Sequence, residues 1–190
     1  MIRPRAIWFA TAAVAVGLLT SCSAGSGAAP VSTPAAAPLR YGAPEVTSPR
    51  DASGVAAEPC ARLLTNQDLR SLGFPGPGRG RTLVDIPECV WANGRDERLS
   101  IAVDTRRDLL ADTYRTRLLP IFVPTTVEGM PAVRQRMRPD DNTCTVTTGL
   151  GPRQALETEW SGLSTRQTED PCAKAEEAIA LVVRKLPPQR

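Results

Sequence analysis

Residues 88–104 read ECVWANGRDERLSIAVD, and this stretch decides the fold class. Its second half alternates apolar with small or polar residues, as a half-buried strand does, through Leu99, Ile101 and Val103. Asn93-Gly94 separates this half from the first, and an Asn-Gly pair is a strong signal for a hairpin turn. The stretch therefore predicts two antiparallel strands, 88–92 and 98–104.

Further strand and helix patterns lie on both sides of this hairpin. Strands are expected at 82–86, at 126–137 around a Gly-Met-Pro interruption, at 143–148 and at 154–161. Helical patterns begin at Thr65, Asp108 and Asp170 and end before Gly73, Pro120 and Pro187. Residues 74–81 are rich in glycine and proline and are expected to form a loop. This order predicts an α+β domain, an antiparallel sheet with helices packed on it.

The N-terminus has the build of a secretory signal. Arg3 and Arg5 precede a short uncharged apolar stretch, and small residues lead from there to a cysteine. The stretch ends in Leu19-Thr20-Ser21-Cys22, which matches the lipobox of bacterial lipoproteins, where the chain is cut before the cysteine and a diacylglycerol is attached to its thiol. We therefore expect residues 1–21 to be a lipoprotein signal peptide and the lipid on Cys22 to anchor the mature chain to the extracytoplasmic face of the cell membrane. An ordinary signal peptide with an incidental cysteine is the alternative.

Composition divides the mature chain into a tether and one domain. Between Ser23 and Pro59, 27 of 37 residues are Ala, Gly, Pro, Ser or Thr. Such a segment buries too little apolar surface to offset the entropy lost on ordering. Residues 22–58 are therefore expected to be a disordered tether, and residues 59–188 are long enough for one globular domain.

The remaining cysteines are expected to form disulfides, because their number is even and the chain carries an export signal: Cys60, Cys89, Cys144 and Cys172. They are separated by 28, 54 and 27 residues, without the short Cys-x-x-Cys steps of most zinc sites. Sequence alone leaves three pairings possible. We expect Cys60–Cys89 and Cys144–Cys172, because both close short loops and each would join the start of a helix to a strand.

The chain contains no histidine, which excludes Ser-His-Asp and Cys-His catalysis, His-ligated metal sites and an imidazole pH switch. No other residue set has the pattern of a catalytic site, so we expect no enzyme activity, no cofactor and no metal. Asp140-Asp141-Asn142 lacks the alternating ligand spacing of a calcium loop and is expected to be a hairpin turn. Removing Arg3 and Arg5 from 23 Lys+Arg leaves 21 against 20 Asp+Glu, so a nucleic-acid partner is not expected.

Two segments are candidates for a binding surface. An apolar run between two prolines could line a cleft or a partner patch, although core is the simpler interpretation: Ile121, Phe122 and Val123. Three arginines alternate along an expected strand and would share one face: Arg134, Arg136 and Arg138. That face could bind an anionic lipid, a phosphate-bearing glycolipid or an acidic partner. A solvated face neutralised by nearby acids is the simpler interpretation.

Several sequence motifs follow one another in a fixed order. They are Pro59-Cys60 with Leu63-Leu64-Thr65 and Asp68-Leu69, Cys89-Val90-Trp91, Val127-Glu128-Gly129-Met130-Pro131-Ala132, Cys144-Thr145-Val146, and Asp170-Pro171-Cys172 before an alanine-rich helix that ends at Leu186-Pro187. Together with the lipobox, this pattern resembles the actinobacterial lipoproteins that carry domain of unknown function 3558, over most of residues 58–188. The resemblance implies a cell-envelope lipoprotein with a fold akin to the Mog1/PsbP-like α/β sandwiches. It implies no activity and no catalytic residues.

These observations favour a binding protein over an enzyme. We expect a lipid-anchored domain that binds a protein or an apolar envelope ligand, because the sequence combines a tether, a cross-linked domain and an apolar segment. The alternative is an accessory or structural lipoprotein of a membrane complex, without a ligand pocket. A pocket of roughly a few hundred Å³ near residues 121–123 would separate the two.

Overall fold

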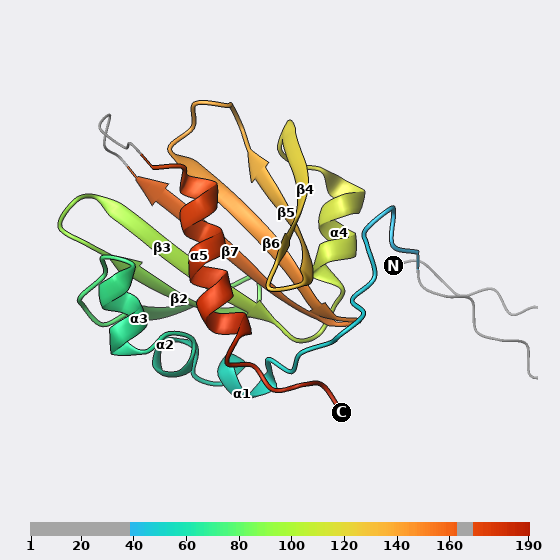
Figure 1. Cartoon of the computed structure of the whole chain (residues 1–190), viewed down its shortest axis with the longest axis horizontal. Coiled ribbons are helices and arrows are strands. Elements are labelled where there is room, and N and C mark those ends of the chain that lie inside the picture. The colour runs from blue at the N-terminus through green and yellow to red at the C-terminus, as the bar shows by residue number, and fades with distance from the viewer. Residues whose placement is uncertain (1–38, 163–168) are drawn as a thin grey trace, which may run out of the picture. The chain divides into compact units, whose positions relative to one another are not determined.

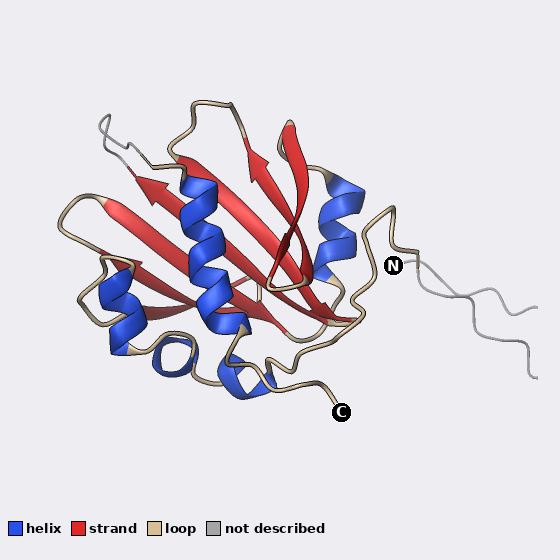
Figure 2. Ribbon diagram, viewed as in Figure 1, coloured by secondary structure: helices blue, strands red, loops and turns tan. Residues whose placement is uncertain are grey.

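The computed structural model describes residues 39–162 and 169–190, and its centre is one seven-stranded antiparallel sheet (Figures 1 and 2). The strands are β1 (Arg79–Leu83), β2 (Ile86–Ala92), β3 (Glu97–Asp104), β4 (Ile121–Val127), β5 (Met130–Arg136), β6 (Thr143–Gly151) and β7 (Gln154–Gly162). The helices are α1 (Ser53–Ala56), α2 (Pro59–Arg62), α3 (Asn66–Ser71), α4 (Leu109–Thr116) and α5 (Pro171–Val183). None of the helices in these two ranges has the length and apolar character needed to cross a membrane. The predicted α+β class is confirmed.

Two meanders of strands meet in the middle of the sheet. The strand order is β1-β2-β3-β7-β6-β5-β4, so the first three strands and the last four are each sequential neighbours. Pairing of β3 with β7 joins the two meanders through eight aligned residue pairs, from Glu97 opposite Gly162 to Asp104 opposite Ala155. α4 lies in the connection between the meanders.

Side-chain alternation gives the sheet an apolar face. The predicted buried positions of β3 are confirmed, because none of their surface is exposed: Leu99, Ile101 and Val103. Across the junction with β7 these three residues lie opposite the buried Trp160, Thr158 and Leu156. This face forms the main core.

α5 covers the apolar face, and in Figure 1 it crosses the central strands. Its start follows the predicted cap, since the Asp170 carboxylate accepts a hydrogen bond from the Cys172 amide at 3.1 Å and Pro171 occupies the first turn. Ala175, Ala178 and Ile179 point into the core without exposed surface. Alanines at the contact allow the helix to pack closely on the strands.

Both disulfides join the start of a helix to a strand, and the predicted pairing is confirmed. Cys60 of α2 is bonded to Cys89 of β2, and Cys172 of α5 is bonded to Cys144 of β6. The Cα–Cα distance is 5.0 Å in each. In the chain-entropy model, a disulfide that closes a loop of about 30 residues stabilises the folded domain by about 3–4 kcal/mol. The two bonds hold α2 and α5 on the same face of the sheet.

α4 covers a part of the opposite face. Its Leu110 and Tyr114 form a second apolar cluster with Val133 and Phe122. Gly149 of β6 makes room for the helix, because a Cβ at that position would lie 2.9 Å from Leu110 Cδ2. α4 lies over the β4–β6 side, so the described helices leave β1, β2 and most of β3 uncovered on this face.

The domain begins before residue 59. Residues 39–58 were expected to belong to the tether, but Ala43 and Ala52 are buried and Arg40 forms an ion pair with Asp108. The amide of Arg50 also donates to the Leu150 carbonyl at 2.8 Å. Small side chains therefore suffice to pack this segment on the sheet, a contact that composition does not reveal. The rest of the predicted tether, residues 22–38, lies outside the described residues.

Three predicted boundaries change. The prediction of a strand at 82–86 is wrong, because Val84 and Asp85 have positive φ and form the turn between β1 and β2. β1 begins at Arg79, inside the segment expected to be a loop, and β4 includes the apolar run that begins at Ile121. The strand expected at 126–137 is divided by a turn at Glu128-Gly129, and Met130 and Pro131 begin β5. α4 ends at Thr116, short of the predicted 119, because Arg117 adopts a left-handed φ of 42°. β1 and β4 are the two edge strands, and their pairing with β2 and β5 decides their conformation.

Gly78→Ala is expected to destabilise the domain, whereas Gly80→Ala is not. A Cβ at Gly78 would lie 2.2 Å from Cys89 Sγ and 2.7 Å from Trp91 Nε1, both in the core. Overpacking of this kind costs about 1–3 kcal/mol. A Cβ at Gly80 meets only Cys60 Sγ, at 3.9 Å, so this variant is the matched control. Urea unfolding of both variants measures the difference, and equal stability would contradict the packing of the 76–80 segment on the disulfide.

Candidate functional site

The face of the sheet opposite α5 brings charged and small side chains together in rows. In one row, Ala102 of β3 lies between Glu88 of β2 and Glu157 of β7. In the next row, Ser100 lies between Val90 and Glu159. We call the uncovered part of this surface the open face, and it consists of Arg79, Arg81, Glu88, Val90, Ala92, Arg98, Ser100, Ala102, Glu157 and Glu159.

The residues of β3 on the open face are small and buried. Ser100 and Ala102 are each only 5% exposed, although no described helix lies over them. Their small side chains are shielded by the longer acids and arginines of β1, β2 and β7. Charged side chains on the neighbouring strands therefore border a row of small, buried residues on β3.

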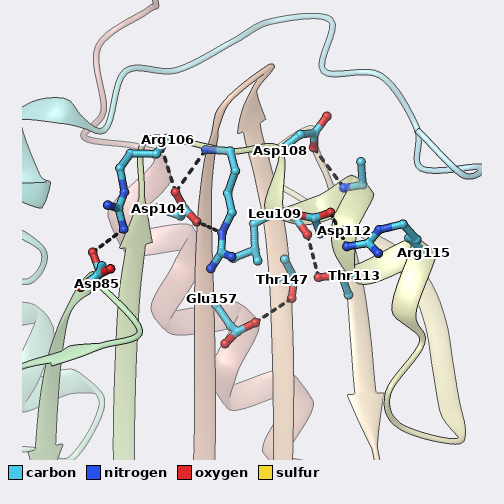
Figure 3. Close-up of polar contacts among 12 residues, drawn as sticks. Asp85, Asp104, Arg106, Asp108, Leu109, Asp112, Thr113, Arg115, Thr147 and Glu157 are labelled. Carbon is cyan, nitrogen blue, oxygen red and sulfur yellow. Dashed lines mark hydrogen bonds and ion pairs between the residues drawn. The ribbon is translucent and has the colours of Figure 1, made fainter. Parts of the chain in front are cut away.

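Glu157 is the acid of the open face with the most perturbed environment. Its carboxylate accepts a hydrogen bond from Thr147 Oγ1 of β6 at 3.5 Å (Figure 3). Burial raises the pKa of Glu157, and the charges of Glu159 and Glu88 raise it further, whereas Thr147 and Arg107 act in the opposite direction. No ion pair to Glu157 is present in residues 39–162 and 169–190. Its carboxyl therefore holds a proton more tightly than that of an exposed glutamate.

At the end of the open face where β3 ends, a polar network joins the β3–α4 connection to the β1–β2 turn (Figure 3). Asp104, at the end of β3, pairs with Arg107 and accepts a hydrogen bond from the Arg106 amide at 2.9 Å. The Arg106 guanidinium donates to the Asp85 carbonyl at 2.6 Å. The β3–α4 connection is thus fastened to the turn between β1 and β2.

A cleft of about 710 Å³ opens at the β1–β3 side of the open face. It is lined by residues 76–81 and by Val90, Ala92 and Arg98. The register places Arg79 opposite Val90 and Arg98 opposite Ala92, so the two arginines flank an apolar floor from both sides. The cleft is built by three neighbouring strands and by the loop that leads into β1.

The arginines that line the cleft differ in their partners. Arg81 forms an ion pair with Glu88, and this bond together with the charge of Glu159 raises the pKa of the Arg81 guanidinium. Arg79 and Arg98 are exposed, and neither takes part in an ion pair with any residue that the structure describes. These two guanidinium groups are available to a ligand.

The predicted apolar surface lies on β4, at the other edge of the sheet from the cleft. Phe122 packs edge-on against Tyr114 of α4, with ring centroids 4.9 Å apart, and Arg117 stacks over it. Val123 faces the other way and is 48% exposed. The run is therefore divided between the second core cluster and the surface, with Ile121 partly exposed.

The three arginines of the predicted row each form an ion pair with an acidic side chain. Arg134 donates two hydrogen bonds to Glu176 of α5, at 2.6 and 2.5 Å. Arg136 pairs with the residue that caps α5 and also contacts its disulfide sulfur. Arg138 pairs with the acids of the 140–142 turn. Arg134 and Arg136 connect β5 to α5, and Arg138 closes the turn after β5. Arg79 and Arg98, without ion-pair partners among the described residues, are better placed to bind a ligand.

Arg79 and Arg98 were not among the residues that the sequence singled out. Arg79 lies in the segment expected to be a loop, which has no predicted face. Arg98 precedes Leu99 in a predicted strand, and alternation alone would have placed it on the polar face. Predicting Arg79 as a site residue would have required the pairing of β1 with β2, because this pairing brings Arg79 beside the floor of the cleft.

The remaining predictions concern metal ligands, the turn at residues 140–142 and Cys22. In the part of the chain that the structure describes, no group of three or more His, Cys, Asp and Glu side chains could hold a metal ion. The Asp141 carboxylate accepts a hydrogen bond from the Arg138 amide at 2.9 Å and closes the turn predicted at residues 140–142. Cys22 lies outside the described residues.

Glu157→Gln is expected to stabilise the domain at neutral pH. Folding raises the Glu157 pKa above the ordinary 4.5, so the wild-type carboxyl adds no penalty below that pH. The penalty grows as the pH rises from 4.5 through the raised pKa and then stays constant. The gain in free energy of unfolding should therefore be larger at pH 8 than at pH 4, as measured by urea unfolding. The exposed Glu45→Gln is the control, and a gain independent of pH would contradict the effect.

Comparison with known proteins identifies the family. The family model described as "Protein of unknown function (DUF3558)" matches residues 17–185. No curated protein and no solved structure matches the chain, so the expected likeness to Mog1/PsbP-like sandwiches stays a prediction. The matched range contains every strand of the sheet, both disulfides and α5. The chain therefore belongs to the DUF3558 family of proteins of unknown function.

Proposed function

We propose that this chain is a lipid-anchored protein of the bacterial cell envelope whose domain is a non-catalytic binding module. The lipobox that ends at Cys22 supports the anchor. The two disulfides support an oxidising compartment, since such bonds form and persist outside the cytosol. The absence of histidine from the whole sequence supports a binding role over catalysis.

The cleft on the open face is the observation that carries the binding function. Its volume of about 710 Å³ lies within the range of small-molecule sites. It combines an apolar floor, Val90 and Ala92, with a few charged groups that can orient a ligand, as such sites do. A cleft of this volume and lining supports a small envelope ligand.

The energetics of the open face also favour a functional surface. A half-buried glutamate without an ion-pair partner in the described residues lowers stability, as the raised pKa of Glu157 indicates. Groups with such perturbed pKa values cluster at functional sites. The main core on the other face, with its disulfides, supplies the stability that allows this cost.

Ala92→Tyr is expected to abolish binding of the natural ligand. Ala92 is exposed and lies on the floor of the cleft, so a tyrosine fills the cleft without disturbing the core. Val123→Tyr, on the exposed part of the apolar run in β4, is the matched control. Native mass spectrometry and lipid extraction of each protein, purified from its own envelope, compare the bound ligand.

Three results separate the alternatives. Loss of the ligand with Ala92→Tyr alone supports the cleft. Loss with Val123→Tyr alone moves the binding site to β4 and overturns the cleft. Wild-type protein without any bound ligand supports the alternative function, an accessory or structural lipoprotein of a membrane complex.

Cys22→Ala is expected to block lipidation and release the protein from the membrane. Cys22 is the only cysteine that follows a lipobox, so no other thiol can replace it as acceptor. Partitioning into a detergent phase before and after the substitution measures the anchor. A variant that still enters the detergent phase would show that the lipoprotein interpretation is wrong.

A further inference from the structure

We infer that the cleft binds an anionic amphiphile, whose oxyanion head lies between Arg79 and Arg98 and whose alkyl chain lies on Val90 and Ala92. This inference rests on the proposed function, because it assigns a ligand chemistry to the same cleft. The head is a phosphate or a carboxylate on an alkyl chain, and the experiment below distinguishes the two.

The register of the strands places the two arginines on opposite sides of β2, two residues apart along it. Arg79 on β1 and Arg98 on β3 flank β2 from opposite sides, next to Val90 and Ala92 respectively. Neighbouring strands are about 4.8 Å apart and successive residues rise about 3.4 Å, so the two arginine positions are about 10 Å apart across β2 and about 7 Å apart along it. Two extended arginine side chains can bridge that span and meet above β2. One oxyanion between them would accept hydrogen bonds from both.

The charges of the site favour an anion at this place. Guanidinium groups bind phosphate and carboxylate oxygens through paired, charge-assisted hydrogen bonds. Of the acids on the open face, Glu88 is neutralised by Arg81. Glu159 lies opposite Ser100, on the side of β3 away from the floor, and its charge also acts on Arg81. Glu88 is therefore compensated, and Glu157 and Glu159 lie on β7, beyond β3 and outside the lining of the cleft. The two cleft arginines have no ion-pair partner in the described chain.

The rest of the cleft suits an alkyl chain. Val90 is half-buried and Ala92 is exposed, so apolar surface on the floor is open to a ligand. The wall is formed by Gly76, Pro77 and Gly78, which present no polar side chain. The wall is also held in place, because Gly78 packs directly on the Cys89 sulfur and Trp91. An inorganic anion would leave this apolar surface unused.

Binding of small probes tests the inference on the mature chain, residues 22–190, with Cys22→Ala so that no attached lipid competes. Octyl phosphate and octanoate carry the two possible heads, inorganic phosphate carries a head alone, and octyl glucoside carries the chain alone. Isothermal titration below the micellar concentration should show binding of at least one anionic octyl compound. The head-only and chain-only probes should bind at least about tenfold more weakly. The stronger of the two anionic compounds identifies the head.

Substitution of each arginine tests the placement of the head. Arg79→Gln and Arg98→Gln should each weaken binding of the stronger probe about tenfold, since each removes charge-assisted hydrogen bonds. Arg153→Gln removes the same charge from an exposed turn between β6 and β7, and should leave the affinity unchanged. All three positions are exposed, and an unchanged melting temperature verifies the fold.

Several outcomes would overturn the inference. These are absence of binding by both anionic octyl compounds, equal affinity for inorganic phosphate, or an equal loss of affinity with Arg153→Gln. A natural ligand that is lost with Ala92→Tyr, together with no binding of the anionic probes, overturns this ligand chemistry but leaves the proposed function in place. Wild-type protein without a bound ligand and without affinity for the probes overturns both.

Discussion

Pairing of β3 with β7 is the constraint on which the rest of this structure depends. These strands are about fifty residues apart in the chain, with α4 and three strands between them. Their register determines both faces of the sheet at once, because a shift by one residue would exchange the faces. The register that places Ile101 against Thr158 beneath α5 also places Ala102 against Glu157 on the open face. The core and the candidate site therefore share one origin.

The two faces of the sheet have different physical roles. The face under α5 is apolar, carries both disulfides and contains the main core. The open face contains the half-buried Glu157, small buried residues on β3, and two arginines without ion-pair partners in the described chain. Stability concentrated on one face leaves the other free to hold groups that do not stabilise the fold. This asymmetry directs attention in a family of unknown function to the cleft and its arginines.

A local sequence pattern identified the shared face of the β5 arginines but not their partners, and it did not identify the cleft arginines. The alternation of Arg134 and Arg136 was visible in the sequence, and both side chains do lie on one face of β5. Their ion-pair partners come from the α5 region, some forty residues later in the chain. These two arginines therefore hold α5 on β5 and are not available to a ligand. Arg79 and Arg98 form no local pattern at all. They become neighbours of one cleft only because β1 and β3 pair with β2 on either side.

The sequence by itself determined the features whose signals are local. The alternation of β3 and the cap of α5 at Asp170 were predictable, because each depends on neighbouring residues. For the cysteines the sequence left three pairings possible, and short loop length only favoured the observed one. Tertiary structure alone decided the edge strands β1 and β4, the packing of residues 39–58 and the cleft. Edge strands take their conformation from a partner, and Ala52 is buried only because the sheet covers it. A binding site assembled from three strands exists only once their register is set, since no single segment contains it.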